Sequence, residues 1–323
     1  MLKIAFHTPQ IDVRGTCSAL FDYAYYNELL LKNQSIIVIP KKSIIRGVND
    51  PIAIVKFKEK FSLVFYEDKD DLQIILEKEK CDILYSIKYG TNDNFICENI
   101  KNCIHCVFDM SEPHGDVYAA VSEQIATKYG KTLFVPHMIG LKPSKTRDNL
   151  RHVLGISDES IIFGRYGGQD TFDITFVPEI IKRIIRERDD IYFVFINTPI
   201  FDEHPQIFFL DKIITDEDKN KFISTCDAHL ECGTLGHTFG LSIGEFSVNN
   251  KPIITYDGWT WNDAHKHILK DKAIYFTNEE TFYNILTTFN PSDYKNRDLN
   301  CYTEYTPEKV MKIFKEVFID DIQ

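Results

Sequence analysis

Residues 231–255 read ECGTLGHTFGLSIGEFSVNNKPIIT, and this stretch is the most informative part of the chain. It contains a glycine-rich loop that ends at Gly240, a short amphipathic helix from about Leu241, a turn and an apolar strand. Glycines leave backbone N–H groups open to an anion, and a helix start adds the positive end of its dipole. Glu245 follows one turn into the helix. The stretch therefore predicts a loop, helix and strand that bind a sugar nucleotide, with its phosphate at the dipole and its ribose on the carboxylate.

The run from His237 to Phe246, HTFGLSIGEF, resembles the donor-binding signature of retaining family-4-type glycosyltransferases, Glu-Gly-Phe-Gly-Leu-x-x-x-Glu-Ala. The Phe-Gly-Leu core and the second glutamate are kept, and His237 stands in place of the first glutamate. The resemblance implies that the core binds the donor diphosphate and that His237 is a catalytic residue beside the transferred sugar. The donor-binding residues implied here are Thr238, Phe239, Gly240, Leu241 and Glu245.

A second match to the same family lies at residues 149–168, NLRHVLGISDESIIFGRYGG, where an apolar strand leads into Gly164 and Arg165. The resemblance implies that both residues bind the donor. Arg165 would be catalytic, because a guanidinium grips two phosphate oxygens at once and stabilises the departing diphosphate. Asp170 stands where the family has a lysine, so Arg165 acts without that partner or another cation replaces it. A surface ion pair is the alternative interpretation of Arg165.

Two loops of the N-terminal half also match the family by position. Gly15 and Thr16 follow the first predicted strand and precede a helix, so they are candidates for contact with the donor phosphates. His114 lies in the loop SEPHGD after another predicted strand, where the family often has a histidine that contacts the transferred sugar. The alternatives are a surface turn and an exposed loop histidine. Ser122 is predicted to cap a helix.

Apolar runs alternate with helical patterns along the whole chain, which predicts two mostly parallel sheets. The family resemblance implies an α/β protein with the GT-B fold, in which two Rossmann-like domains face each other across a cleft. We expect an acceptor-side domain at 1–140 and a donor-side domain at 141–323, with a hinge at 140–146. The last helix, about 307–318, could pack back on the first domain. Predicted strands are 2–8, 36–40, 61–67, 81–88, 102–108, 117–123, 132–138, 160–166, 191–197, 206–211, 228–232, 252–256 and 273–277. Predicted helices are 17–32, 69–79, 122–128, 175–187, 216–224, 262–269, 279–288 and 307–318, besides the one at Leu241.

The chain has 323 residues, 44% of them apolar, and a formal net charge of −11. This length fits two domains. The acidic charge argues against a nucleic-acid partner. No apolar run approaches the ~18 residues needed to span a membrane, and the start of the sequence, MLKIAFHTPQ, lacks a signal-peptide layout. We therefore expect a cytoplasmic protein without a membrane span.

Two short patterns could suggest a metal ion. Cys103-x-x-Cys106 encloses His105, but the run NCIHCVF alternates as a strand does, which points the two cysteines to opposite faces. Asp68-x-Asp70 matches the metal-binding triplet of the GT-A fold, but this acidic run fits the start of a helix. We expect no metal site, no cofactor and reduced cysteines.

The family resemblance implies an enzyme that moves a sugar from a nucleotide-diphosphate sugar, UDP-linked or GDP-linked, to a hydroxyl of a glycan or glycoconjugate acceptor, with retention. Two alternatives remain: an enzyme of the same fold with other chemistry, such as an epimerase or a phosphorylase, and a non-catalytic relative that only binds sugar nucleotides. Trp259 and Trp261 follow a predicted strand and provide either an aromatic surface for sugars or bases, or a packed loop.

Overall fold

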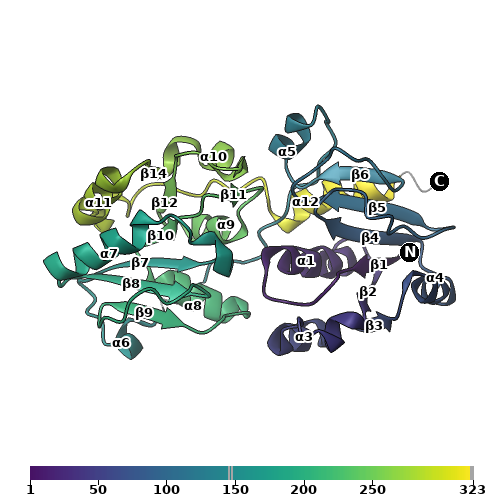
Figure 1. Cartoon of the computed structure of the whole chain (residues 1–323), viewed down its shortest axis with the longest axis horizontal. Helices are drawn as coiled ribbons and strands as arrows, with labels where there is room; N and C mark the ends of the chain where they lie inside the picture. Colours follow the sequence, from purple (N-terminus) through teal and green to yellow (C-terminus); the bar gives the residue numbers. More distant parts are fainter. Residues whose placement is uncertain (145, 147, 321–323) are drawn as a thin grey trace. The chain divides into compact units, whose positions relative to one another are not determined.

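The computed structural model describes residues 1–144, 146 and 148–320. The chain forms two compact units, one of Met1–Gly140 together with the segment from Glu304 onward, the other of Leu141–Thr303. Each unit is built on one six-stranded parallel sheet with helices on both faces (Figure 1). The predicted hinge includes position 145, which lies outside the described residues.

The sheet of the first unit has the strand order β3-β2-β1-β4-β5-β6. Its strands are β1 (Lys3–His7), β2 (Gln34–Pro40), β3 (Ser62–Tyr66), β4 (Ile83–Lys88), β5 (Lys101–Cys106) and β6 (Val117–Ala120). Its helices are α1 (Gly15–Leu29), α2 (Lys42–Ile45), α3 (Pro51–Lys58), α4 (Lys69–Lys78), α5 (Glu123–Lys128) and α12 (Pro307–Phe314), which continues into the π-helical turn η4 (Lys315–Ile319).

Apolar residues on both faces of this sheet explain its stability. On one face, Leu72 of α4 packs in a cluster with Val38 and Leu84. On the other face, Tyr23 of α1 lies with its ring centroid 5.2 Å from that of Phe314 in α12. Because strands of a parallel sheet are covered on both sides, they are apolar almost throughout, as the sequence shows.

The sheet of the second unit has the order β14-β12-β10-β7-β8-β9. Its strands are β7 (Ile161–Tyr166), β8 (Ile191–Ile196), β9 (Ile207–Leu210), β10 (Ala228–Glu231), β12 (Ile253–Tyr256) and β14 (Ile274–Phe276), with a separate short pair, β11 (Gly236–His237) and β13 (Asn262–Asp263). Its helices are α6 (Arg151–Leu154), α7 (Phe176–Glu187), α8 (Asp216–Thr225), α9 (Leu241–Val248), α10 (Ala264–Leu269) and α11 (Glu279–Thr288), with 3-10 turns η1 (Gln169–Thr171), η2 (Lys270–Lys272) and η3 (Pro291–Asp293).

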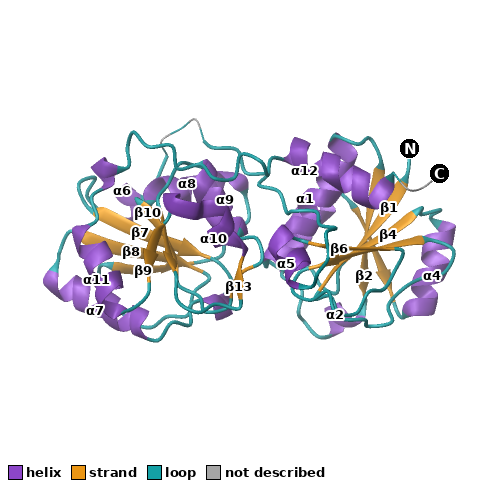
Figure 2. Ribbon diagram, turned by 90° about the horizontal axis from the view of Figure 1, so that it is seen from above, coloured by secondary structure: helices purple, strands orange, loops and turns teal. Residues whose placement is uncertain are grey.

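The two faces of the second sheet are covered by different helix pairs (Figure 2). Helices α7 and α11 bury Ile181 and Leu286 against Phe163 and other strand residues in one core cluster. Helices α8 and α9 cover the opposite face, where Phe222 and Phe246 lie in edge-to-face contact. This second face carries His229 of β10, whose ring stacks on Phe246 of α9.

Both sheets read 3-2-1-4-5-6 when their strands are numbered within the unit, which is the order of dinucleotide-binding folds. The chain reverses direction across the sheet between β1 and β4 in the first unit and between β7 and β10 in the second. Ligands of such sheets bind beyond the carboxyl ends of the two strands at that point. The second unit therefore has its expected ligand position at the ends of β7 and β10, near Arg165 and Glu231.

Most predicted elements are confirmed, and the exceptions have local causes. The strand predicted at 132–138 is wrong: only a single bridge between Ala120 and Phe134 forms there, and Pro136 has no N–H for a ladder. Helix α3 was not predicted, although Asp50 caps it by accepting from two backbone N–H groups. Asp68 caps α4 and accepts from the Asp71 N–H at 2.9 Å. Among the described helices, none has the length and apolar character that crossing a membrane requires.

Candidate active site

Arg165 is the last residue but one of β7, and its side chain is wholly buried. One guanidinium nitrogen, Nη1, donates to Thr198 Oγ1 at 2.6 Å, and Nη2 donates to Thr171 Oγ1 at 2.7 Å and to the Gly168 carbonyl at 3.1 Å. Burial lowers the pKa of Arg165, while the carboxylate of Glu231 acts in the opposite direction. The guanidinium therefore holds the 167–171 loop in place and brings a buried positive charge to the end of the strand.

Glu231 ends the neighbouring strand, β10, and is only 3% exposed. Its Oε2 lies 3.0 Å from His237 Nε2 and 3.8 Å from His229 Nε2. Burial alone would raise the pKa of Glu231, but His237, His229 and Arg165 outweigh burial and bring that pKa well below its usual value. Glu231 is thus an ionised carboxylate beneath the loop that carries His237.

Two further histidines border this carboxylate and stay neutral near pH 7. Burial lowers the pKa of His229, whose ring stacks on Phe246 at 4.3 Å. Burial also lowers the pKa of His265 to about 3, and its ring lies edge-to-face with His237 at 5.2 Å. Neutral imidazoles offer both a donor and an acceptor nitrogen, so they suit hydroxyl groups.

Unpartnered polar atoms gather around this end of the second sheet. Buried polar groups are almost always hydrogen-bonded, so a cluster of exceptions marks a site that a ligand completes. His237 Nε2 is among them although it lies at ion-pair distance from Glu231, because the angles are outside those of a hydrogen bond. Within the described residues, the buried side-chain atoms here without a hydrogen bond are Arg165 Nε, His229 Nδ1 and Nε2, Glu231 Oε1, His237 Nε2 and His265 Nδ1.

The start of α9 leaves backbone N–H groups open beside these atoms. Gly240 caps the helix with φ at +89°, a conformation that L side chains rarely adopt, and supplies no side-chain cap. The first N–H groups of a helix have no partner within the helix, so they bind anions at its positive end. Thr238 and Phe239, which lead into the cap, are buried. The stretch from Thr238 to Leu241 thus leads into an open helix start, and its donor-binding role stays a prediction.

Glu245 lies on the buried side of α9 and has two partners in the protein. Lys219 of α8 donates to Glu245 Oε1 at 2.5 Å, and the hydroxyl of Tyr166 donates to Oε2. Burial, and then the charge of Glu245, raise the pKa of Tyr166. Lys219 brings a cation to the predicted ribose-binding carboxylate, which the sequence did not reveal.

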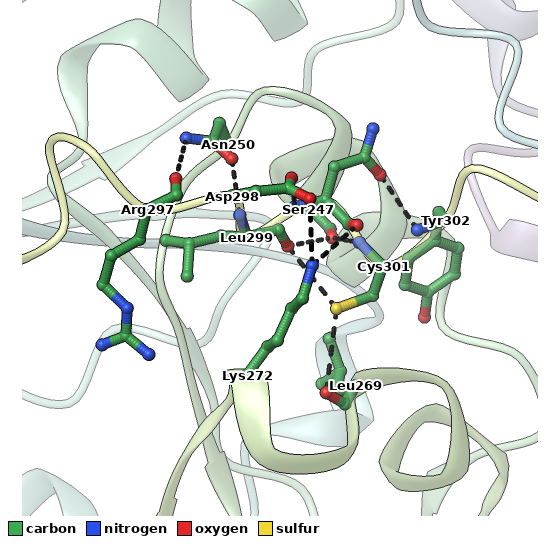
Figure 3. A network of polar contacts seen from close by, with 10 residues as sticks. Ser247, Asn250, Leu269, Lys272, Arg297, Asp298, Leu299, Cys301 and Tyr302 are labelled. Carbon is green, nitrogen blue, oxygen red and sulfur yellow. Dashed lines mark hydrogen bonds and ion pairs between the residues drawn. The ribbon is translucent and has the colours of Figure 1, made fainter.

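A polar network holds α9 from its far end (Figure 3). Ser247 Oγ donates to the Leu299 carbonyl at 3.0 Å and accepts from the Cys301 N–H at 2.9 Å. Asn250 Oδ1 accepts from the Leu299 N–H at 2.7 Å. The hydroxyl of Tyr302, in the same segment, donates to the Phe239 carbonyl at 3.0 Å. The segment 297–302 therefore fixes both the helix and the loop that leads into it.

Gly164 stands in a different environment from the one its donor-binding assignment implies. It lies on β7 against α8, and a Cβ atom built on it would lie 2.1 Å from Cys226 Sγ and 3.2 Å from the Phe222 ring. Packing alone therefore requires glycine at this position. The donor-binding role of Gly164 stays a prediction.

The remaining predicted site residues belong to the first unit. Gly15 and Thr16 begin α1 and are exposed, and Arg14 before them makes no side-chain cap. His114 is buried, and its Nδ1 lies 2.8 Å from the Glu112 carbonyl. Because a carbonyl only accepts, Nδ1 is the donor of this hydrogen bond, and Nε2 is buried without a hydrogen-bond partner. Their roles toward donor and acceptor stay predictions.

Metal-ligand groups do not appear in the part of the chain that the structure describes: no three His, Cys, Asp or Glu side chains are placed to hold an ion. All eight cysteines are free.

Sequence reasoning missed five residues of this site: Tyr166, Lys219, His229, Glu231 and His265. Alternation along β10 could have indicated two of them, because His229 and Glu231 are two residues apart and share one face of the strand. Lys219 comes from a separate helix, and no local pattern pairs it with Glu245.

No protein-family model and no curated protein sequence matches the chain. Solved structures do. HepE from Anabaena, in complex with UDP-glucose, superposes with a TM-score of 0.67 at 11% identity, over 98% of this chain and 96% of that one. A glycosyltransferase from Rickettsia africae gives a TM-score of 0.67 at 13% identity, over 99% of both chains. A Listeria monocytogenes protein assigned as a UDP-N-acetylglucosamine 2-epimerase gives 0.61 at 12% identity, over 98% and 96%.

At identities this low, the superpositions establish the fold alone. They confirm the predicted fold class, an α/β chain with two six-stranded parallel sheets that matches GT-B glycosyltransferase structures.

Proposed function

We propose that this chain is a retaining glycosyltransferase, which moves a sugar from a nucleotide-diphosphate sugar to a hydroxyl of a glycan or glycoconjugate. The cluster of unpartnered buried polar atoms beside the open start of α9 carries the proposal. A diphosphate would accept from the helix N–H groups, and sugar hydroxyls would pair with the Glu231 and histidine atoms. A UDP-sugar is the first donor to test, because the HepE structure contains UDP-glucose.

The proposed chemistry needs no protein nucleophile. The bond between the sugar C1 and the β-phosphate oxygen breaks while the acceptor oxygen bonds to C1 on the same face, and the acceptor proton passes to the leaving phosphate. Negative charge grows on the diphosphate as it departs, so donors aimed at it lower the barrier. The α9 N–H groups would supply this stabilisation, together with the buried charge of Arg165. His237, oriented by Glu231, would hold a hydroxyl of the transferred sugar.

An epimerase acting on a UDP-sugar is the second candidate, favoured by the similarity to the Listeria protein. Both reactions begin with binding of the nucleotide sugar, so binding does not separate them. The products do: an epimerase returns an isomeric UDP-sugar without acceptor, whereas a transferase releases UDP, slowly to water and faster to an acceptor.

The first experiment is thermal unfolding with UDP, GDP, ADP and their sugars, followed by NMR of the products. We expect one nucleotide to raise the melting temperature and its sugar to release free nucleotide in the presence of EDTA. Arg165→Ala should then lower kcat by roughly 10²–10³, and Arg165→Lys should recover part of the loss. Arg183→Ala, on the exposed side of α7, is the control. No nucleotide binding, or normal kcat in Arg165→Ala, contradicts the proposal.

A further inference from the structure

Both tryptophans of the chain lie in one loop, between β12 and α10. Trp259 is 65% exposed and Trp261 is 62% exposed. Their ring centroids are 4.9 Å apart and their planes meet at 69°, so the two indoles form an open corner. Large aromatic rings are normally buried, and an exposed pair marks a binding surface.

The corner is fixed in place by the loop of the candidate active site. Strand β13 pairs with β11, so that Gly236 lies opposite Asn262 and His237 opposite Asp263. The Trp261 N–H donates to the Thr234 carbonyl at 3.3 Å. Gly236, with φ at +63°, has no room for a side chain, since a Cβ atom would lie 1.8 Å from the Asn262 carbonyl oxygen. Whatever binds the indoles therefore lies next to the loop that carries His237.

The charges around the corner indicate what it binds. Asp257 and Asp263 flank the indoles in the sequence with half-exposed carboxylates; Lys266 Nζ lies 3.2 Å from the first and His267 Nε2 lies 3.5 Å from the second. Aromatic anchors of membrane surfaces come with unpaired cations, and this chain carries a net charge of −11. A pyranose ring fits this set: its C–H faces pack on indole, and its hydroxyls donate to carboxylates.

We propose that the Trp259–Trp261 corner is a carbohydrate subsite, which binds a pyranose of the acceptor glycan other than the sugar that is transferred and so brings part of the acceptor to the unit expected to bind the donor. It extends the proposed glycosyltransferase function, on which it rests, because only a glycan acceptor presents a second sugar to this surface. The angle of 69° between the ring planes gives one face and one edge to a non-planar ring. A planar nucleobase would stack on the face of only one indole ring.

The tryptophan count makes a direct test possible, since intrinsic indole fluorescence reports on this corner alone. The full chain is titrated with cellobiose, maltose, lactose, chitobiose and a mannose disaccharide, each without nucleotide, with excitation where tyrosine does not absorb. We expect a saturable shift of the emission with at least one disaccharide. Trp259→Phe should keep part of the response, and calorimetry on Trp259→Ala should show affinity reduced about tenfold or more. Tyr89→Ala, which removes another exposed aromatic ring, is the control.

Each result supports or overturns the subsite. A shift of the tryptophan emission with UDP alone assigns the corner to the base of the donor, and a shift only with lipid vesicles assigns it to a membrane surface. An unchanged emission with every disaccharide shows that the corner is not a sugar site. Each of these three results overturns the proposal. Failure of the proposed function is seen separately, as the absence of nucleotide stabilisation in a protein that still binds a disaccharide. Nucleotide stabilisation retained in Trp259→Ala shows that the variant is folded.

Discussion

Gly164→Ala tests whether this glycine serves the donor or the packing of the second unit. The added methyl group would lie 2.1 Å from Cys226 Sγ, against about 3.5–4.0 Å for a comfortable contact, so one of the two groups must move by about 1.5 Å. Cys226 is fully buried, and its thiol lies 3.2 Å from the Phe222 carbonyl as a donor. The shift therefore has to pass into β7 or α8.

The expected cost follows from this geometry. Overpacking of a filled core costs about 1–3 kcal/mol, and we expect Gly164→Ala near the upper end because the contact is so short. Cys226→Ala removes the Sγ atom and leaves Cβ, which lies 3.1 Å from the added methyl. The double variant should therefore be more stable than the sum of the single effects by about 1 kcal/mol or more.

Urea unfolding followed by circular dichroism gives the four stabilities of this cycle, and the UDP-induced melting shift gives donor binding for each variant. If packing is the role of Gly164, donor binding recovers when Cys226→Ala restores the fold. A Gly164→Ala protein as stable as the parent but unable to bind nucleotide would refute the reasoning and make Gly164 a donor contact. Strict additivity in the cycle would also contradict it.

Two other predictions concern the charges of the site and the buried histidines. Glu245→Ala should weaken nucleotide binding by about 1–3 kcal/mol in calorimetric titration, because it removes a charged hydrogen-bond acceptor. Lys219→Met removes the Lys219–Glu245 ion pair but keeps the carboxylate. An equal loss of binding in both variants would therefore assign the effect to the ion pair and not to a contact with the ribose. Burial lowers the pKa of His7 and of His265 to about 3 from 6.5, so the unfolded chain binds more protons between these values. The free energy of unfolding should therefore fall as the pH falls through this window, by up to about 1.4 kcal/mol per pH unit for each histidine. Urea unfolding at several pH values should show a weaker pH dependence for His265→Gln. An unchanged pH dependence would count against a buried, neutral His265.

The parts of the fold that could be predicted are those with a local signal. Gly240 before an apolar helix and the Asn-Asn turn before PIITY mark α9 and β12 through backbone chemistry, and both are present. The run 132–138 is as apolar as a strand, yet burial of residues such as Met138 in irregular backbone explains it equally well. An apolar run indicates that its residues are buried. Whether it pairs as a strand depends on the strands beside it, which a local stretch of sequence does not reveal.

The candidate site divides in the same way. The open helix start at residues 238–241 follows from the glycine and the helix position, so the sequence predicts it, whereas its binding of an anion stays a prediction. The environment of Arg165 does not, because Thr198 lies after another strand. Likewise, the partner of Gly164 is a thiol 62 residues away. Side chains that meet only in the folded sheet leave no pattern along the chain.

The return of the chain from the second unit to the first has a consequence for biosynthesis. The second unit is one continuous segment, whereas the first is completed by residues after Glu304, whose Phe314 and Phe318 both pack on Tyr85. A chain emerging from the ribosome can therefore finish the second unit while the first still exposes the aromatic surface that α12 covers. We expect nascent first units to be the species that chaperones hold, and the last helix to act as the closing step of folding.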